Sequence, residues 1–342
     1  MRLKTAVVIL NWNGRHFLEK FLPDVIRYSR EDAEIIVADN ASSDDSVEWL
    51  RLHHPEVSII LNEKNEGFTG GYNKALAQVK NEFYVLLNSD VEVTENWLKP
   101  LIALMESKPT VGACQPKILS YHERDKFEYA GAGGGFIDCF GLPFCRGRIF
   151  NSLETDHHQY DDECPVFWAT GACMMVRSSV YHELQGLDEN FFAHMEEIDL
   201  CWRMQRAGHQ IYYCGKSTIY HVGGGTLPKN SPRKTYLNFR NNLLMIYKNA
   251  KPEEFKRIYF SRTILDFVAA LKFLFTNGYA DFKAVLKAHR DFHTLKKKYN
   301  PEKGEHFSID AYSFIYKGSI LWDYYLYRHT NFAALKKWPK KS

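Results

Sequence analysis

The sequence predicts an α/β fold, with a mostly parallel sheet flanked by helices and a helical C-terminal segment. Three observations support this prediction. The first 120 residues alternate short apolar runs with segments of helical periodicity. Polar residues directly follow each apolar run, and after residue 241 the pattern becomes helical throughout. We therefore expect two regions: a sheet-based domain over residues 1–242, and a basic, aromatic-rich helical region over residues 243–342.

The expected strands of the first region are short, apolar or β-branched, and end at or next to Asn or Asp. They are Thr5–Leu10, Glu34–Asp39, Ser58–Asn62 and Phe83–Asn88. Between them, apolar residues recur at helical spacing. The expected helices cover residues 17–26, 46–54, 72–79 and 97–107.

Residues 120–165 are rich in glycine and charge, so we expect a long loop or hairpin insertion over one edge of the sheet. Regular structure resumes over residues 167–177, 178–184, 196–207, 210–214 and 218–221, and a linker follows over residues 223–232. In the helical region the residues of one helix face are apolar. They are Ile264, Phe267, Val268, Leu271, Leu274 and Phe275, whereas Arg262, Asp266 and Lys272 lie off this face.

The composition indicates a globular protein. Of the 342 residues, 45% are hydrophobic and 25% charged, which excludes disordered, collagen-like and disulfide-scaffold classes. The net charge is only +3, yet residues 251–342 hold 18 Lys and Arg against 9 Asp and Glu, so the rest of the chain is acidic. A basic tail on an acidic body predicts a polyanionic neighbour, either a membrane or a nucleic acid.

Several features favour a cytoplasmic location. The seven cysteines form no C-x-x-C pair and their number is odd, which is typical of reduced thiols. The apolar run near the N-terminus, Ala6–Leu10, is too short for the core of a signal peptide. The longest apolar stretch, Ile264–Phe275, is interrupted by charges and falls short of the ~20 residues that a spanning helix needs. Peripheral attachment to a membrane surface stays open.

Two common nucleotide-binding loops are missing. The segment Asn11–His16 does not match G-x-G-x-x-G, and Gly131–Phe136 lacks both the third glycine and a preceding strand. No Walker A sequence occurs. A dinucleotide-binding site and a P-loop ATPase are therefore excluded.

The residues that follow the strands are the candidates for ligand binding, because ligands bind outside the carboxyl ends of open parallel sheets. Asp39 can accept a hydrogen bond from a nucleobase or ribose and Trp12 can stack on a base, although Asp39 could instead cap a helix and Trp12 lie in the core. Asp90 could hold Mg²⁺ or Mn²⁺ together with a diphosphate, or form a turn. His221, before Gly223–Gly225, could complete that metal site or be structural.

The stretch Phe191–Arg203 is the most informative one. Adjacent acids open a helix, and Asp199 lies four residues before Arg203, which by itself describes a well-capped surface helix. The surrounding apolar residues instead favour a carboxylate that acts as a general base. Burial raises a carboxylate pKa and a helix N-terminus lowers it, so the sequence leaves the balance open.

Seven segments occur in the order and approximate spacing of a known family. They are VVILNWNG, IIVADNASSDDS, LNEKNEGFTGGYNKAL, YVLLNSDVEV, TGACMMVR, GLDENFFAHMEEIDLCWRMQRAGH and YHVGGGT. Over Val7–Asn242 the chain resembles family 2 glycosyltransferases of the GT-A fold, in the bacterial branch with rhamnosyltransferase-like and galactofuranosyltransferase-like enzymes. The resemblance implies inverting transfer of a sugar from a nucleotide-diphosphate donor to an acceptor hydroxyl, in cell-surface polysaccharide or glycolipid assembly.

The resemblance also implies roles for individual residues. Those assigned to the nucleotide are Asn11, Trp12, Asp39, Asn65 and Gly67. Those assigned to a divalent metal, Mn²⁺ or Mg²⁺, are Asp90 and His221. The presumed catalytic base is Glu197, and the residues assigned to the donor or acceptor sugar are Gly171, Glu196, Asp199 and Arg203.

Two positions depart from the family pattern. The base is Glu where Asp is usual, and the metal motif reads Asn88-Ser89-Asp90 where Asn-Pro-Asp or Asp-x-Asp is commoner, so coordination through Asn88 has little support. In the implied mechanism Glu197 takes the proton of the acceptor hydroxyl as that oxygen attacks the anomeric carbon. The metal neutralises charge on the departing diphosphate.

The C-terminal region combines lysine clusters, Lys296–Lys298, Lys336–Lys337 and Lys340–Lys341, with interleaved Trp and Tyr. This pattern fits a helical segment on the anionic cytoplasmic face of an inner membrane, where polyprenyl-linked saccharide acceptors would be found. It fits equally a helical subdomain packed on the catalytic domain. No nucleic-acid-binding module accompanies the charges, so no nucleic acid partner is expected. The alternative function is a non-catalytic nucleotide-sugar or glycan-binding protein on the same fold.

Overall fold

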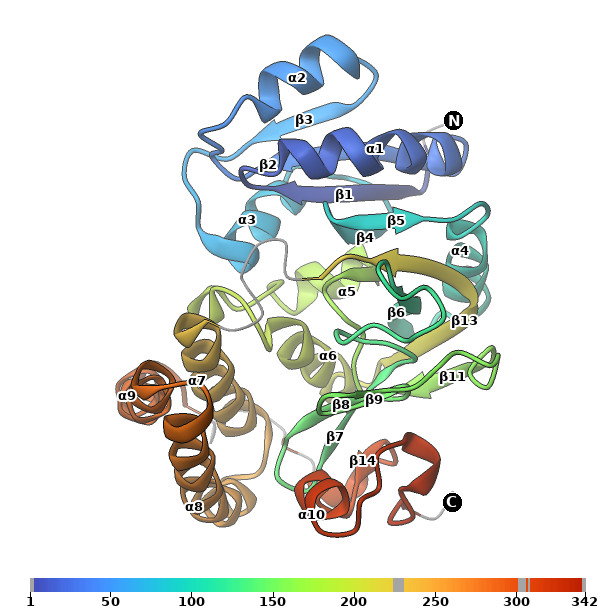
Figure 1. Ribbon diagram of the computed structural model, residues 1–342. Helices are drawn as coiled ribbons and strands as arrows, with labels where there is room; N and C mark the ends of the chain where they lie inside the picture. The colour runs from blue at the N-terminus through green and yellow to red at the C-terminus, as the bar shows by residue number, and fades with distance from the viewer. Residues whose placement is uncertain (1–2, 224–230, 301–305, 307, 340–342) are drawn as a thin grey trace.

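The structure is a computed structural model that describes residues 3–223, 231–300, 306 and 308–339 (Figure 1). These residues form a large sheet covered by helices on both faces, a smaller sheet, and a C-terminal helical part. The predicted α/β fold with a helical C-terminal segment is confirmed. Most of the predicted linker, including Gly224 and Gly225, and the pair Lys340–Lys341 lie outside the described residues.

The large sheet has the strand order β11-β13-β6-β12-β4-β1-β2-β3, and β5 pairs with β13. Its strands are β1 (Thr5–Asn11), β2 (Ala33–Asp39), β3 (Ser58–Leu61), β4 (Phe83–Asn88), β5 (Val91–Val93), β6 (Val111–Ser120), β11 (Glu163–Val166), β12 (Cys173–Arg177) and β13 (Gln210–His221). Strands β1, β2, β3, β4, β6 and β13 point one way, while β5, β11 and β12 oppose their neighbours. The sheet is therefore mixed rather than mostly parallel, but the strands that carry candidate residues end at one edge.

The helices of the sheet domain divide between its two faces. They are α1 (Arg15–Ser29), α2 (Ser46–His53), α3 (Gly67–Leu76), α4 (Leu98–Ser107), α5 (Ser178–Glu183), the 3₁₀ turn η1 (Glu189–Phe191) and α6 (Glu196–Arg206). Helices α1, α2 and α4 contribute to one buried apolar cluster, and α3, α5 and α6 contribute to the other. Burying apolar side chains on both faces fixes the sheet between two helical layers.

Two elements differ from their expected limits. Helix α3 begins at Gly67 rather than Tyr72, because its early glycines allow a close approach to β1 and β2: a Cβ on Gly71 would lie 2.9 Å from both Asn40 Nδ2 and Leu10 Cδ1. The two strands expected over residues 210–221 are one strand, β13, with a register irregularity between Cys214 and Thr218.

The insertion over residues 120–165 forms most of a second sheet, in the order β10-β9-β8-β7-β14. Its strands are β7 (Gly135–Asp138), β8 (Pro143–Cys145), β9 (Arg148–Ile149), β10 (Ser152–Leu153) and β14 (Ile315–Tyr316). Strand β14 comes from near the end of the chain and pairs in parallel with β7. All seven cysteines of the chain are free.

The C-terminal part is mainly helical. It contains α7 (Pro232–Asn249), α8 (Pro252–Thr276), α9 (Tyr279–Leu295) and α10 (Ile320–Tyr325), with the 3₁₀ turns η2 (Lys296–Lys298), η3 (Ile309–Ala311) and η4 (Phe332–Ala334). Ser231 caps α7 by accepting a hydrogen bond from the Lys234 backbone N–H, and Pro232 starts the helix. Helix α7 packs on α6, α8 and α9, so it joins the helical part to the sheet domain.

Helix α8 turns its charged side inward. Arg262 and Asp266 are buried, the Arg262 Nε donates to Asp266 Oδ1 at 3.0 Å, and His289 of α9 contacts the same carboxylate. The apolar face of α8 instead points outward, with exposed fractions from 38% to 84%. This outer face of α8 consists of Phe260, Ile264, Phe267, Val268, Leu271 and Phe275. No helix in the described ranges is long and apolar enough to cross a membrane.

Candidate active site

A network of polar side chains lies at the carboxyl ends of β1 and β2. The Asn11 amide donates to Asp39 Oδ2 at 3.0 Å, and Asp39 Oδ1 accepts the Ser42 backbone N–H at 2.9 Å. Asp39 thus shapes the turn after β2, but it does not cap α2, whose N-cap residue is Asp45. Trp12 is 46% exposed, which excludes a core role and leaves its ring free to stack on a base.

The network continues toward β3 and α3 through Asn65 and Gly67, which were assigned to the nucleotide, and through Asn40 and Asn62, for which no role was predicted. The Asn40 amide donates to Asn65 Oδ1 and to the Gly67 carbonyl, both at 3.0 Å, and the Asn62 amide donates to Asn40 Oδ1. The side-chain oxygen Oδ1 of Asn65 also accepts the Gly67 backbone N–H. Asn62 follows β3 as Asp39 ends β2, so its position after a strand was a signal that could have identified it.

Asp90 and His221 are brought together by the pairing of β5 with β13, in which Val91 lies opposite His221. The His221 Nε2 lies 3.2 Å from Asp90 Oδ1, and both residues are buried. Burial opposes a charge on Asp90, but the hydrogen bond and charge of His221 hold the pKa of this carboxyl below its ordinary value. The spatial proximity expected of two ligands of one metal is therefore present.

A third residue, Glu128, completes this group on the other side of the imidazole. Its Oε2 lies 3.4 Å from His221 Nδ1, a buried nitrogen that has no hydrogen-bond partner in the part of the chain that the structure describes. Although burial lowers the pKa of His221, the charge of Glu128 and the hydrogen bond to Asp90 raise it to about 10. In the carboxylate–histidine–metal arrangement, one imidazole nitrogen contacts a carboxylate and the other binds the metal. His221 contacts a carboxylate through each nitrogen, so a metal that replaced the proton on one of them would give this arrangement. We call Asp90, His221 and Glu128 the edge triad.

The edge triad fits a divalent metal better than the other acidic group does. Ligand atoms of Asp156, His158 and Asp161 lie within 4.8 Å of one another. However, the Lys117 ammonium, 3% exposed, already donates to both aspartates of that group. In the edge triad the cation that lies between Asp90 and Glu128 is the protonated His221, and a metal can displace its proton.

The predicted base, Glu197, lies in the first turn of α6. Its Oε2 is buried and has no hydrogen-bond partner among the described residues, and the same holds for Oε2 of Glu196. Burial raises the pKa of Glu197 to about 7, although backbone N–H groups of the helix start and of Gly171 oppose the shift. Burial and the neighbouring charge raise the pKa of Glu196 as well. The carboxyl group of Glu197 thus titrates near neutral pH, where its ionised form can accept a proton, as a general base requires.

The segment before α6 has an unusual backbone. Phe192, His194 and Met195 all have positive φ, between 68° and 74°. Such conformations cost of order 1–3 kcal/mol each and persist where surrounding contacts impose them. The Asn241 amide of α7 supplies these contacts by donating to the carbonyls of Phe191, Ala193 and His194 at 2.8–3.0 Å. We call residues 192–195 the base loop.

The base loop also contacts the start of α3, which carries the predicted nucleotide residue Gly67. The Phe192 carbonyl accepts the Phe68 N–H at 2.9 Å, and a Cβ on Gly67 would lie only 2.6 Å from the same oxygen. Gly67 has φ +74°, so both its conformation and its surroundings require glycine. The predicted nucleotide residue Gly67 and the predicted base are therefore coupled through Phe192.

Asp199 and Arg203 lie on another face of α6, away from Glu197. The Asp199 carboxylate, fully buried, accepts hydrogen bonds from Arg203, Lys248 and Asn249 at 2.8–2.9 Å. Burial alone would raise its pKa, but the Lys248 and Arg203 charges hold it below the ordinary value. Arg203 also donates to the Leu184 and Gly186 carbonyls. These contacts give both side chains a structural role, and sugar binding by them stays a prediction.

Comparison with known proteins supplies the family. The family model described as glycosyl transferase family 2 matches residues 6–185, more than half of the chain. The chain belongs to this family. Its predicted activity as a glycosyltransferase is thereby confirmed.

Relatives of this family 2 glycosyltransferase act in glycan assembly. The low-salt glycan biosynthesis hexosyltransferase Agl10 of Haloferax volcanii is 27% identical over 247 residues, 70% of this chain and 74% of Agl10. The N-acetylglucosaminyl-diphospho-decaprenol L-rhamnosyltransferase of Mycobacterium tuberculosis is 24% identical over 233 residues, 63% and 75% of the two chains. The predicted rhamnosyltransferase-like family is therefore supported by sequence.

A solved structure confirms the fold. The crystal structure of GalNAc-T7 with UDP, GalNAc and Mn²⁺ superposes on this family 2 glycosyltransferase with a TM-score of 0.59 and 16% identity, covering 87% of this chain and 58% of that one. At this identity the likeness establishes the fold and no residue's role. The predicted GT-A-like architecture is confirmed.

Proposed function

We propose that this family 2 glycosyltransferase is an inverting, metal-dependent enzyme with Glu197 as its general base. One observation carries the proposal. Within the described ranges one buried oxygen of Glu197 has no hydrogen-bond partner, and burial raises the pKa of this carboxyl to about 7. The base loop that precedes it contacts Phe68 of α3, next to Gly67 of the polar network at the strand ends. A base in this state can accept a proton from an acceptor hydroxyl at neutral pH.

In the proposed mechanism the chain's own residues orient the donor and move one proton. Asn11, Trp12, Asp39, Asn65 and Gly67 bind the nucleotide, with Trp12 stacking on the base. Glu197 removes the proton of the acceptor hydroxyl while that oxygen attacks the anomeric carbon. Gly171, Glu196, Asp199 and Arg203 are proposed to lie near the sugars. Asp90 and His221 would hold Mn²⁺ or Mg²⁺, which neutralises charge on the departing nucleoside diphosphate.

We propose a polyprenyl-linked saccharide as the acceptor and bacterial cell-surface glycan assembly as the setting. The M. tuberculosis relative is named for N-acetylglucosaminyl-diphospho-decaprenol, which supports an acceptor of this class. Such an acceptor would be reached from the cytoplasmic face of a membrane. The proposed domain organisation is a catalytic domain over residues 1–242 with a membrane-facing helical region over residues 243–342.

The outer face of α8 supports contact with an anionic membrane surface. Its apolar side chains would enter the lipid interface. In α8 and α9, both described throughout, the exposed cations outnumber the single exposed acid, Glu253. These cations are Lys256, Arg257, Lys272, Lys283, Lys287 and Arg290. A second copy of the chain would bring the same charges and be repelled, whereas anionic lipids complement them.

The function is tested by turnover with a panel of nucleotide sugars, with and without Mn²⁺, using a lipid-linked saccharide acceptor. We expect sugar transfer with one donor, loss of transfer in EDTA, and product of inverted anomeric configuration. Donor binding without transfer to any acceptor would contradict the proposal and favour a non-catalytic binding protein.

The membrane contact is tested separately by sedimentation with phosphatidylglycerol vesicles. The Phe267→Ser/Phe275→Ser variant should partition at least about tenfold more weakly than the wild type, because each buried Phe contributes roughly 1.5–3 kcal/mol. The control variant Leu52→Ser/Leu61→Ser changes equally exposed residues of α2 and β3 and should bind like the wild type. Equal binding by all three proteins would exclude the outer face of α8 from membrane contact.

A further inference from the structure

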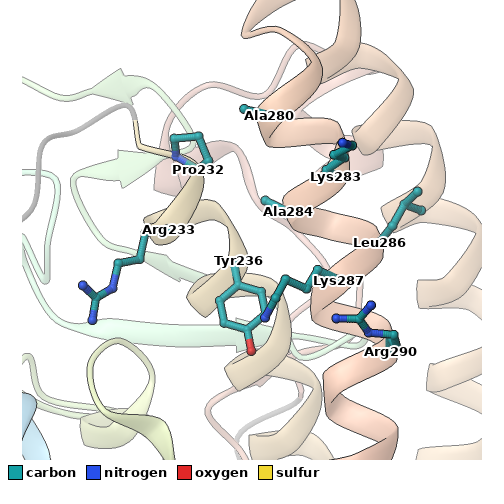
Figure 2. Close-up of a pocket in the computed structure, with 9 residues that line it drawn as sticks. All are labelled: Pro232, Arg233, Tyr236, Ala280, Lys283, Ala284, Leu286, Lys287 and Arg290. Carbon is teal, nitrogen blue, oxygen red and sulfur yellow. The ribbon is translucent and has the colours of Figure 1, made fainter.

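A cleft of about 710 Å³ lies between the first turns of α7 and helix α9 (Figure 2). Its apolar lining comes from Pro232, Ala280, Ala284 and Leu286. Its polar lining is cationic apart from the Tyr236 hydroxyl. The cations are Arg233, Lys283, Lys287 and Arg290. We call this feature the α7–α9 cleft.

The nearby carboxylates only partly neutralise these cations. Asp291 accepts hydrogen bonds from Tyr236, Lys287 and Arg290, and Asp281 accepts one from Thr235. The charged ends of Arg233 and Lys283 instead lie over aromatic rings, at 4.9 Å from the Phe192 centroid and 4.5 Å from the Tyr279 centroid. The cleft therefore keeps a positive charge, and its Arg and Lys side chains suit a polyvalent anion with several oxygen atoms.

The position of the α7–α9 cleft connects it to the candidate base. In Figure 2 Arg233 points away from α9, and its guanidinium group lies over Phe192, the first residue of the base loop. Burial, together with the charge of the adjacent Lys234, lowers the pKa of His194 in the same loop to about 4. An anion bound in the cleft would thus lie beside the base loop, which comes just before Glu197. It would also lie next to the helical region.

We propose that the α7–α9 cleft binds the diphosphate that links the acceptor saccharide to its lipid chain. This inference rests on the proposed function, because it assumes a lipid-linked acceptor. Cationic side chains would hold the two phosphates directly. The apolar lining would contact the first isoprene units, and the outer face of α8 belongs to the same helical layer. The donor diphosphate belongs at the edge triad instead, where carboxylates can share a metal with it.

Direct binding is measured with farnesyl diphosphate in EDTA, so that binding through a metal at the edge triad is suppressed. We expect saturable binding to the wild type and at least about tenfold weaker binding to the Lys283→Glu/Arg290→Glu variant. Both residues are exposed on α9, so the substitutions spare the core. The matched control, Arg51→Glu/Lys99→Glu, carries the same charge change at exposed positions of α2 and α4 and should bind like the wild type.

Turnover measurements distinguish the two possible sources of the bound anion, the diphosphate of the acceptor and the headgroup of a phospholipid. With the diphosphate-linked acceptor, the cleft variant should show a KM raised at least about tenfold, whereas its kinetics with a neutral alkyl glycoside of the same saccharide should match the wild type. If the variant loses only binding to phosphatidylglycerol vesicles, and farnesyl diphosphate binds wild type and variant equally, the cleft binds phospholipid headgroups and the proposal is overturned.

The two proposals fail in distinguishable ways. Transfer by the wild type with an unchanged KM in the cleft variant would overturn the cleft assignment and leave the proposed function intact. Farnesyl diphosphate binding that depends on the cleft, without transfer from any donor, would uphold the site and overturn the catalytic proposal.

Discussion

The first turn of α6 holds carboxyl groups in two opposite environments. Glu196 and Glu197 each have a buried oxygen without a hydrogen-bond partner among the described residues, and burial raises their pKa values. Asp199, on another face of the same turn, is more deeply buried but accepts three hydrogen bonds, two of them from cations, and its pKa is lowered. Burial alone therefore does not decide protonation; the contacts made by α7 do.

The comparison teaches how one helix separates catalysis from stability. Helix α7 supplies Lys248 and Asn249 to Asp199, and it supplies Asn241 to the backbone of the base loop. No described residue of α7 forms a hydrogen bond with Oε2 of Glu197. An unpaired carboxylate costs stability and is retained where reactivity needs it. The following substitutions test this separation.

The largest effect is expected for Glu197→Gln, because Gln cannot accept the proton. Turnover should fall by about 10²–10⁴-fold, the usual contribution of a general base, while donor binding is unchanged. The Glu183→Gln variant alters an exposed acid of α5 and serves as the control. Turnover of Glu197→Gln within a factor of three of the wild type would remove Glu197 from the base role.

The same variant should be more stable than the wild type at pH 8. The unfolded carboxyl loses its proton near 4.5 and the folded one near 7, so the native state loses stability as the pH rises between these values. Gln avoids that loss, and we expect a gain of at least about 1 kcal/mol. Denaturant melts at pH 8 measure it, and a variant less stable than the wild type would break the comparison.

Asp199→Asn should have the opposite effect. Removing one partner of a buried ion pair leaves Lys248 and Arg203 partly uncompensated, and we expect a loss of about 3 kcal/mol in the free energy of unfolding. In the double variant Asp199→Asn/Lys248→Met the two effects should not add, because one interaction is removed twice. Urea melts of the four proteins give the coupling energy; strict additivity would show that the ion pair contributes little.

Glu128→Gln should weaken the metal site without abolishing it. Residues that orient a metal-bound histidine typically contribute 10–100-fold to metal affinity. We therefore expect Mn²⁺ affinity, measured by titration calorimetry in the presence of nucleoside diphosphate, to fall by about that factor. Glu123→Gln, an exposed acid in the same insertion, is the control. An unchanged affinity in Glu128→Gln would exclude Glu128 from orienting His221 at the metal site.

The smallest effect expected is the pH dependence of the wild type. With a base whose pKa is about 7, kcat/KM should rise about tenfold between pH 6 and pH 8 as Glu197 loses its proton. Rates measured with subsaturating acceptor and saturating Mn²⁺ provide the profile. A flat profile over this range would indicate that Glu197 is already ionised at pH 6.

Much of the fold, and several residues at the carboxyl ends of its strands, could be predicted because both depend on the local sequence pattern. Strands β1, β2 and β4 are apolar runs with a polar residue at the end, so Asn11, Asp39 and Asp90 were visible in the sequence. The joining of Asp90 to His221, far apart in the chain, was one of two alternatives that the residues left open and was favoured by the family resemblance; the pairing of β5 with β13 explains it.

The remainder depends on contacts between distant segments. Glu128 lies in a glycine-rich insertion without periodicity, and it reaches His221 because its backbone N–H binds the Ile118 carbonyl of β6. The sequence correctly divides α8 into an apolar and a charged face. It does not reveal that the charged face packs inward, because Arg262 and Asp266 find their partners in His289 of α9, Asn242 of α7 and each other.

The pairing of β7 with β14 has a consequence for synthesis of the chain. Ile320 next to β14 donates its backbone N–H to the buried Asp138 at the end of β7, a residue 182 positions earlier. While the ribosome makes the intervening helices, one edge of β7 has no strand paired with it. The apolar side chains near β7 are then not yet covered by the C-terminal segment. Open edges recruit other strands. Nascent chains that stall before β14 emerges should therefore be prone to aggregate and to need a chaperone, although their catalytic edge is already complete.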